Sequence, residues 1–260
     1  MKYGFIGCGN MGSAIAKALS QSTKDILLSD RSGKAKTIAD SLGCTYGTSQ
    51  QAANCDFVFL GVKPQGMAEV LHQLHPVLQT KKPVLISMAA GMTVSTIEAL
   101  AGGNLSVIRM MPNTPVAVGK GVIQYCCNSL VTDAALQTFL QDMAPAGLLD
   151  SIDESLMDAA TSVSGCGPAF AYLFLDALAQ GGIACGLSPE KATQYAAQTL
   201  IGAAEMVMTQ GISPKELAQK VCSPGGSTIE GVKVLQNRDL AGTVMDCVKA
   251  SFEKNKQLGK

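Results

Sequence analysis

A glycine-rich turn at 223–228, with the sequence SPGGST, is the segment whose residue types point most directly to ligand binding. Its two glycines permit backbone conformations that other residues resist, and the stretch from Thr228 to Gln236 has a helical pattern. Free backbone amides at the start of that helix would converge on a carboxylate or a phosphate. An ordinary tight turn before a helix is the alternative, and this segment alone does not decide between them.

A second glycine-rich turn at 7–12, with the sequence GCGNMG, is more specific because of its surroundings. It directly follows an apolar run at 3–6 and precedes an amphipathic helical pattern, which is the strand–turn–helix context of dinucleotide binding. In that context Gly7 makes the turn, Gly9 admits the pyrophosphate, and Gly12 lets helix and strand pack closely. The residues expected to contact a nicotinamide dinucleotide here are Ile6, Gly7, Cys8, Gly9, Asn10, Met11 and Gly12.

The end of the next expected strand carries conflicting signals on the choice of cofactor. Asp30 would accept hydrogen bonds from the ribose hydroxyls of NAD and repel the extra phosphate of NADP. Arg31 and Ser32, with lysines nearby, would instead hold that phosphate if the Asp30 side chain turned aside. The residues therefore leave both NADP(H) and NAD(H) open as cofactors.

Three further loops follow expected strands, so they should lie at the carboxyl edge of the sheet, where doubly wound folds bind ligands. Each Pro or Gly in these loops could simply interrupt the secondary structure. Their shared edge favours a role in binding the dinucleotide. The residues assigned to that role are Val62, Lys63, Pro64, Ala89, Ala90, Gly91, Asn113 and Pro115, together with Thr48.

The elements that must position these loops follow from the periodicity of apolar residues. Short apolar or β-branched runs alternate with helical patterns through about the first 150 residues, which is typical of a mainly parallel, doubly wound α/β sheet covered by helices. From about Asp153 onward the strand signals stop and Ala-rich helical segments follow. We therefore expect a Rossmann-type dinucleotide-binding domain over 1–152 and an all-helical domain over 153–260. The expected strands are 3–6, 26–29, 57–60, 84–87, 105–110 and 122–125.

Charge and hydropathy restrict the class of partner. The net charge is zero at pH 7 and no basic block is present, so we expect a small-molecule substrate and no nucleic acid. The stretch 159–187 contains a single charged residue, Asp176. Glycines and a proline at 165–168 break this stretch, and Gly181, Gly182 and Gly186 are expected to end it, which predicts a buried helix and no membrane span.

The helical half has few aromatic residues and many Ala and Gly residues on otherwise apolar helices. That leaves more apolar surface than about 105 residues can bury alone. We therefore expect a homodimer through the helical domain, or a higher homo-oligomer built from it. A compact monomeric bundle, capped by the first domain, is the alternative.

Cysteine and histidine usage argues against a disulfide framework and a metal site. The nine cysteines include no C-x-x-C pair, and the glycine-rich start of the chain is unlike a secretory signal, which favours the reduced cytoplasm. His72 and His75 lie one helical turn apart, but no cluster of Cys or carboxylate residues supports them as ligands. We expect no bound metal.

The chain resembles the pyrroline-5-carboxylate reductase family over nearly its whole length, with motifs in matching order and spacing. These motifs are IGCGNMG, GVKP at 61–64, SMAAG at 87–91, MPNTP at 111–115, VSGCGPAF at 163–170 and VCSPGGSTIEGV at 221–232. The resemblance implies reduction of the cyclic imine 1-pyrroline-5-carboxylate to L-proline by hydride from NAD(P)H, the last step of proline biosynthesis. It also implies dimers of interlocked helical domains.

The family motifs imply roles for individual residues. Thr228 would hydrogen-bond the ring nitrogen of the imine through its hydroxyl, while the surrounding turn would hold the carboxylate. A protonated imine accepts hydride without a strong enzymic acid, which fits the absence of an evident catalytic His or Cys. The substrate-binding residues implied are Ser223, Gly225, Gly226, Ser227, Val163, Ser164 and Gly165.

Two alternatives remain open from the sequence. A β-hydroxyacid dehydrogenase of the 6-phosphogluconate type needs a lysine shortly after the glycine-rich start of a helix, and here none occurs between Gly167 and Lys191. A protein that binds the dinucleotide as a sensor, without catalysis, is disfavoured by the intact Thr228 and SPGGST turn. Cys166 and Phe170 depart from the family pattern, which usually has Ser and Tyr there.

Overall fold

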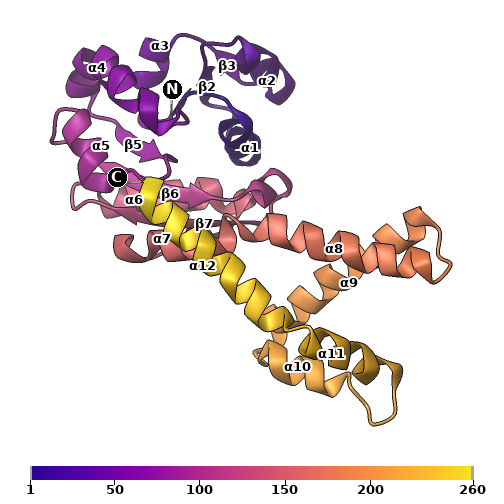
Figure 1. Cartoon of the computed structure of the whole chain (residues 1–260). Helices are drawn as coiled ribbons and strands as arrows, with labels where there is room; N and C mark the ends of the chain where they lie inside the picture. Colours follow the sequence, from indigo (N-terminus) through magenta and orange to yellow (C-terminus); the bar gives the residue numbers. More distant parts are fainter. Residues whose placement is uncertain (1, 259–260) are drawn as a thin grey trace. The chain divides into compact units, whose positions relative to one another are not determined.

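The computed structural model describes residues 2–258, which form two compact units. The first unit contains residues 2–166 together with 251–258, and the second is Gly167–Ala250 (Figure 1). The domain boundary expected between residues 152 and 153 stays a prediction. The helix that follows it, α7 (Met157–Ser164), belongs to the first unit.

One sheet forms the centre of the first unit within residues 2–258. Its strands are β1 (Tyr3–Ile6), β2 (Ile26–Ser29), β3 (Thr45–Tyr46), β4 (Phe57–Leu60), β5 (Val84–Ser87), β6 (Val107–Pro112), β7 (Gly121–Cys127) and β8 (Gly147–Ser151). Their order is β3-β2-β1-β4-β5-β6-β7-β8, and all neighbours pair in parallel except β6 with β7. The expected doubly wound, mainly parallel sheet is confirmed.

Strands β1, β2, β4 and β5 have the bounds that their apolar runs predict, whereas β6 and β7 differ from the expected bounds by one or two residues. The sequence does not predict β3 or β8. Both residues of β3 are exposed, and β8 lies at the sheet edge with half-buried and exposed residues alternating. Such strands bury too little apolar surface to leave a continuous hydrophobic run.

Helices cover both faces of this sheet. They are α1 (Asn10–Leu19), α2 (Lys34–Leu42), α3 (Ser49–Ala53), α4 (Pro64–Lys81), α5 (Val94–Leu100) and α6 (Asp133–Met143), with short 3-10 helices η1 (Thr114–Val118), η2 (Ala144–Ala146) and η3 (Glu154–Leu156). Phe5 and Phe59 belong to the core that contains α1 and α6 residues, whereas Val58 and Leu60 belong to the core with α3, α4 and α5. Because strand side chains alternate in direction, each central strand contributes to both cores.

The parallel strands place several loops at one edge of the sheet. Gly7 follows β1, Asp30 follows β2, Gly61 follows β4 and Met88 follows β5. Hydrogen bonds from Gly7 N to Ser29 O (2.8 Å) and from Gly61 N to the carbonyl of Ile6 (2.9 Å) hold these loops together. The carboxyl edge of β1, β2, β4 and β5 is therefore where the predicted dinucleotide residues gather.

The second unit consists of helices. They are α8 (Gly167–Ala184), α9 (Pro189–Gln210), α10 (Pro214–Lys220), α11 (Ser227–Asn237) and the larger part of α12 (Leu240–Leu258), whose last turns belong to the first unit. The expectation that Gly181 and Gly182 end a helix is wrong, because α8 continues through both. A Cβ on Gly182 would lie 3.1 Å from a methyl group of Leu187, so this glycine lets the loop after α8 pack closely against the helix. The turn comes at Gly186, whose φ is +100°.

Helix α8 leaves its apolar side chains exposed on the single chain. Leu173 is 72% exposed and Tyr172 is 61% exposed. Glu154–Ala184, which spans the break between α7 and α8, is the one segment of the described chain long and apolar enough to cross a membrane by length and composition. Within one copy of the chain the burial expected for this helix is therefore limited to Ala179 and the residues beside it.

Candidate functional site

The three glycines of the GCGNMG turn differ in what surrounds them. Gly7 has a φ of +97°, and a Cβ there would lie 2.7 Å from the carbonyl oxygen of Gly61. A Cβ on Gly12 would lie 2.5 Å from the carbonyl oxygen of Gly7, whereas a Cβ on Gly9 would meet no atom within 4 Å. Gly7 and Gly12 are thus required by the fold itself. Gly9 leaves open space beside the backbone, which fits the close approach of a pyrophosphate.

A first cavity of about 560 Å³ lies on one side of this turn. It brings together residues expected to bind the dinucleotide from the loops after β1, β2 and β4. Its predicted lining residues are Ile6, Gly7, Cys8, Gly9, Asp30, Arg31, Ser32, Val62 and Lys63.

A second cavity of about 690 Å³ adjoins the first, because Gly9, Val62 and Lys63 line both. It adds the loop after β5 to the site. Its other predicted lining residues are Asn10, Met11, Gly12, Pro64, Ala89 and Ala90. The two cavities share Gly9, Val62 and Lys63 and lie along the carboxyl edge of the sheet, where doubly wound folds bind dinucleotides.

Four residues assigned to the cofactor, Thr48, Gly91, Asn113 and Pro115, line neither cavity. The Thr48 hydroxyl accepts a hydrogen bond from Gln51 N (3.2 Å), and the Gln51 side chain accepts one from Thr48 N (2.9 Å), so Thr48 caps α3. Asn113 is buried and binds Ser164 and Val122 of its own unit. The contacts of Thr48 and Asn113 are therefore structural.

The cavities also include residues that the sequence does not predict. Ser49 and Gln50 line the first cavity, and Thr114 and Ala117 line the second. Ser49 and Gln50 follow β3 by a short loop, and this two-residue strand leaves no apolar run to mark it. Thr114 lies inside the MPNTP motif, between Asn113 and Pro115, which are both assigned to the cofactor. That motif is the sequence signal that could have identified Thr114 as a cavity residue.

The Asp30 carboxylate is turned toward its own loop. Its Oδ2 accepts a hydrogen bond from the Ser32 hydroxyl at 2.6 Å, and its Oδ1 accepts one from Gly33 N at 2.9 Å. The Arg31 guanidinium lies 3.2 Å from Glu69 Oε1, and both side chains are largely exposed. The loop therefore supplies one donor to each oxygen of the acid, and Arg31, Ser32 and Lys34 line the cavity together with Asp30.

Cys8, inside the GCGNMG turn, is a buried neutral thiol. Burial, followed by the negative charge of Asp30, raises the pKa of this thiol to about 12. Its Sγ donates a hydrogen bond to Ser29 O at 3.7 Å. A thiol with so high a pKa is a poor nucleophile at neutral pH, so Cys8 serves as a small packing residue.

The start of each helix shows which backbone amides are available to a ligand. Ser or Thr side chains cap α3, α5, α6, α9 and α10. Within residues 2–258 no side-chain cap is present at α1, α2 and α4, which begin around the cavities, or at α11, which begins at the SPGGST turn. At α2 and α4 some first-turn amides are already engaged, since Lys34 N donates to Ser32 Oγ (3.5 Å) and Gly66 N donates to Lys63 O (3.0 Å). The first-turn amides of α1 and α11 can bind an anion.

The SPGGST turn is tight and open to solvent. Gly225 has a φ of +75°, Gly226 N donates to Ser223 O at 3.0 Å, and a Cβ on Gly226 would lie 2.7 Å from the Ser223 hydroxyl oxygen. Ser223, Ser227 and Thr228 are exposed at the start of α11. Hydroxyl groups and free amides therefore converge around one point in the second unit.

The remaining predicted substrate residues lie at the end of α7 in the first unit. Val163 and Gly165 are exposed, and Ser164 is half-buried. Asn113 Nδ2 donates to the carbonyl of Ser164 at 2.9 Å, and Gln124 Nε2 donates to its hydroxyl at 2.7 Å. These bonds fix the end of α7 against β6 and β7.

Two family models match the chain, and relatives match it from end to end. The model for pyrroline-5-carboxylate reductase dimerisation matches residues 154–258, and the model for NADP oxidoreductase, coenzyme F420-dependent, matches residues 2–91. Pyrroline-5-carboxylate reductase of Aquifex aeolicus is 35% identical over 99% of this chain and 97% of its own length. The chain belongs to the pyrroline-5-carboxylate reductase family.

Other members of the pyrroline-5-carboxylate reductase family agree in sequence and structure. The Escherichia coli protein is 34% identical over 100% of this chain and 98% of its own. The crystal structure of Plasmodium falciparum pyrroline carboxylate reductase with NADP bound covers 100% of this chain and 98% of that one, with 33% identity and a TM-score of 0.90. The resemblance drawn from the motifs is confirmed.

The dimerisation model of the pyrroline-5-carboxylate reductase family spans the helices that carry the exposed apolar surface. Leu173 and Tyr172 of α8 lie inside the matched residues. Their exposure on the single chain is therefore explained by homo-oligomerisation of this region.

Proposed function

We propose that this chain is a pyrroline-5-carboxylate reductase, which reduces 1-pyrroline-5-carboxylate to L-proline with NADPH in the last step of proline biosynthesis. The observation that carries the proposal is that this member of the family has a site for the dinucleotide and a site for the substrate carboxylate. The cavity beside Gly9 is open to a dinucleotide, and the SPGGST turn presents uncapped amides with Thr228 exposed. Nothing in the reaction requires a metal.

The residues around the first cavity favour NADP(H) over NAD(H). Each Asp30 carboxylate oxygen already accepts one hydrogen bond within the loop, from Ser32 or from Gly33, which leaves less of the acceptor capacity of this carboxylate for ribose hydroxyls. Arg31 and Lys34 would neutralise a 2′-phosphate there. The bound cofactor supplies the hydride. The chain holds it with the backbone of the GCGNMG turn, the start of α4 and the loop after β5.

The substrate carboxylate would bind the free amides at the start of α11, together with the Ser223 hydroxyl. The Thr228 hydroxyl oxygen would accept a hydrogen bond from the protonated ring nitrogen. Hydride adds to the imine carbon, the C=N π pair moves onto the nitrogen, and the proton already on that nitrogen remains. Thr228 therefore orients the ring and needs to transfer no proton itself. Val163, Ser164 and Gly165 would line the substrate from the end of α7.

The working form is a homodimer through the helical region, which can assemble further. The second unit buries only Ala179, Ala192 and Ala196 in its own described core, too little to stabilise helices of this length. Covering the apolar face of α8 with a second copy supplies the missing burial. We place the enzyme in the cytoplasm, because all nine cysteines, which lie in the described part of the chain, are free thiols. Neither nucleic acid nor a membrane is among its proposed partners.

The test is oxidation of NADPH and of NADH, measured in parallel with purified protein and 1-pyrroline-5-carboxylate, with proline identified as the product. We expect turnover with both and a higher kcat/KM with NADPH. A second sample with Arg31→Ala should narrow that preference without abolishing turnover, because it removes one partner of the 2′-phosphate. No oxidation by folded, nucleotide-binding protein would overturn the proposal in favour of a dinucleotide sensor.

A further inference from the structure

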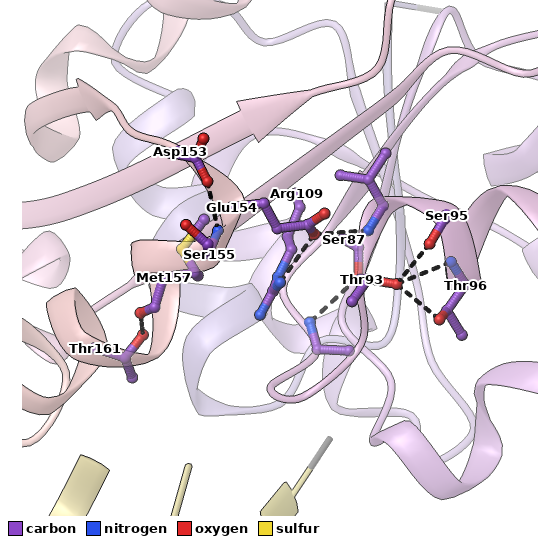
Figure 2. A network of polar contacts seen from close by, with 12 residues as sticks. Ser87, Thr93, Ser95, Thr96, Arg109, Asp153, Glu154, Ser155, Met157 and Thr161 are labelled. Carbon is purple, nitrogen blue, oxygen red and sulfur yellow. Dashed lines mark hydrogen bonds and ion pairs between the residues drawn. The ribbon is translucent and has the colours of Figure 1, made fainter. Parts of the chain in front are cut away.

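The first unit contains a buried arginine whose charge is met by a residue distant in the sequence. Arg109 on β6 is 4% exposed, and its Nη1 donates to Glu154 Oε1 at 2.9 Å. The same carboxylate oxygen accepts a hydrogen bond from Val94 N at 2.8 Å. Figure 2 shows the Glu154 carboxylate beside the Arg109 guanidinium. A single oxygen atom thus joins β6, the start of α5 and η3, which leads into α7.

The α5 end of this network fixes a loop of the cofactor site. Met88, Ala89 and Ala90 line the second cavity, and the loop they begin ends where α5 starts at Val94. Ser87 Oγ accepts from Ala89 N at 3.3 Å near the loop start, and Thr93 caps α5 by accepting from Thr96 N at 3.1 Å (Figure 2). The bond from Val94 N to Glu154 secures the far end of that loop.

The other end of the network sets the start of α7, and further bonds hold the rest of this helix. Asn113 and Gln124 bind Ser164 at its end, and Asn113 is next to Thr114 of the second cavity. Asn255 of α12 donates to the carbonyl of Asp158 at 3.3 Å and to the Ser162 hydroxyl at 3.1 Å. Figure 1 shows the last turns of α12 beside α7. Helix α7 is therefore anchored at both ends and along its length.

Removing either residue of the Arg109–Glu154 pair should destabilise the first unit. Arg109 Nε is buried without a hydrogen-bond partner in the described chain, so the contact to Glu154 is the main compensation for the guanidinium charge. Removing the carboxylate would leave an uncompensated buried charge beside the α5 amide. Neither residue lines the first or second cavity, so the pair acts through the elements that it joins.

We propose that Arg109 and Glu154 are positioning residues for hydride transfer. They hold α7, and with it Val163, Ser164 and Gly165, in register with the loop that lines the second cavity. The inference rests on the proposed reductase function, because it assigns the end of α7 to the substrate. Small displacements of reacting groups reduce turnover strongly, even when the altered residue lies far from the chemistry.

The test compares Glu154→Ala and Glu154→Gln with the wild type. A glutamine keeps an oxygen that can accept from both Val94 N and Arg109, but it lacks the charge. The control is Asp56→Asn, which likewise removes the negative charge from an ion pair, the more exposed Lys81–Asp56 pair (2.7 Å) at the amino edge of the sheet, before β4. The readouts are kcat, both KM values, the dissociation constant for NADPH, the thermal midpoint, and hydrogen exchange of ligand-free protein over residues 87–96 and 157–165.

We expect Glu154→Ala to lower kcat by about tenfold or more while the NADPH dissociation constant changes by less than about threefold. Exchange should accelerate in both segments. Both Glu154 variants should lower the thermal midpoint, because Arg109 loses its counter-charge. Only the alanine variant should lose kcat, since the glutamine retains the geometry. Asp56→Asn should leave kcat and exchange in these segments unchanged.

The inference is overturned if Glu154→Ala keeps the wild-type kcat at a temperature where it is folded. It is equally overturned if kcat falls alike in both variants, in step with the thermal midpoint, because the pair would then stabilise the fold without positioning it. Absence of turnover in the wild type would instead overturn the proposed function, and the inference with it. Failure of the proposed function is thus distinguishable from failure of the inference, because it is seen in the wild-type protein before any substitution is made.

Discussion

The three glycines of the GCGNMG turn are of two kinds. Gly7 and Gly12 are enclosed by backbone oxygens, so their lack of a side chain is needed for the turn and helix to form at all. Gly9 faces empty space, so the folded chain alone gives no reason for a glycine there. The motif assigns all three to the cofactor, but the geometry separates two structural positions from one that only a ligand explains.

Alanine substitutions at two of these glycines should therefore affect different properties, NADPH binding in one case and stability in the other. Gly9→Ala should leave the thermal midpoint unchanged but weaken NADPH binding by about tenfold or more, because the methyl group occupies the space of the pyrophosphate. Gly12→Ala should lower the free energy of unfolding by about 1–3 kcal/mol, because its Cβ meets the Gly7 carbonyl. Chemical denaturation and NADPH titration of both variants would check this, and equal stability losses would contradict it.

Thr228 is expected to orient the substrate ring through a single hydrogen bond. Thr228→Ala should reduce turnover by about ten- to a hundredfold with NADPH affinity little changed. Thr228→Ser keeps the hydroxyl and should stay near the wild-type rate, which controls for loss of packing at the start of α11. Steady-state kinetics of the wild type and the two variants would test this role. An unchanged rate in the alanine variant would remove Thr228 from the mechanism.

Among the elements, the helices divide by how they begin. Those with Ser or Thr caps, such as α3 and α10, satisfy their own first amides. Those that begin with Gly9 or Gly226 cannot do so with a side chain, and they start at the proposed pyrophosphate and carboxylate sites. At α1 and α11 the first-turn amides that no side chain caps are available to bind a ligand at the helix end.

Thr48 provides a test at this scale, since the sequence assigns it to the cofactor and the structure shows it capping α3. Thr48→Ala should lower the free energy of unfolding by about 1 kcal/mol without a specific loss of NADPH affinity. Thr48→Ser retains the capping hydroxyl and should behave like the wild type. Weaker NADPH binding at full stability, measured by titration alongside urea denaturation, would instead support contact with the cofactor.

The sequence predicts the elements that bury continuous apolar runs, and it fails where other forces decide. The strands β1, β2, β4 and β5 follow from their hydrophobic residues, and the GCGNMG turn follows from its context between strand and helix. The direction of the Asp30 side chain depends on hydrogen bonds within its own loop, which no pattern specifies. Ser49 lines the first cavity from the start of α3, just after β3, and β3 is too short for an apolar pattern to predict it.

At the scale of the whole molecule, apolar surface is distributed unevenly between the two units. The first has two extensive cores on either side of its sheet, whereas the described core of the second consists of three alanines. Large apolar residues of the second unit instead face outward, with Leu173 at 72% exposure. Such a unit depends on another copy for its burial, which fits the dimerisation model that matches it.

Leu173→Asp should therefore dissociate the oligomer, because a charge replaces apolar surface on α8 that a second copy would cover. Sedimentation velocity should show a monomer, and circular dichroism should show reduced helix content. The control is Leu130→Asp, at a residue 43% exposed in the first unit, which should leave the oligomer intact. An unchanged sedimentation coefficient for Leu173→Asp would place the interface elsewhere.

The return of α12 to the first unit has a consequence for how the protein is made. Asn255 supports α7, but the ribosome must first synthesise all of Gly167–Ala250, which takes on the order of ten seconds. The sheet up to β8 can fold while that synthesis proceeds, since its strands lie earlier in the chain. Helix α7 gains its contacts to Asn255 only after that synthesis. The helix whose end is proposed to meet the substrate is therefore among the last parts of the first unit to gain its full set of contacts.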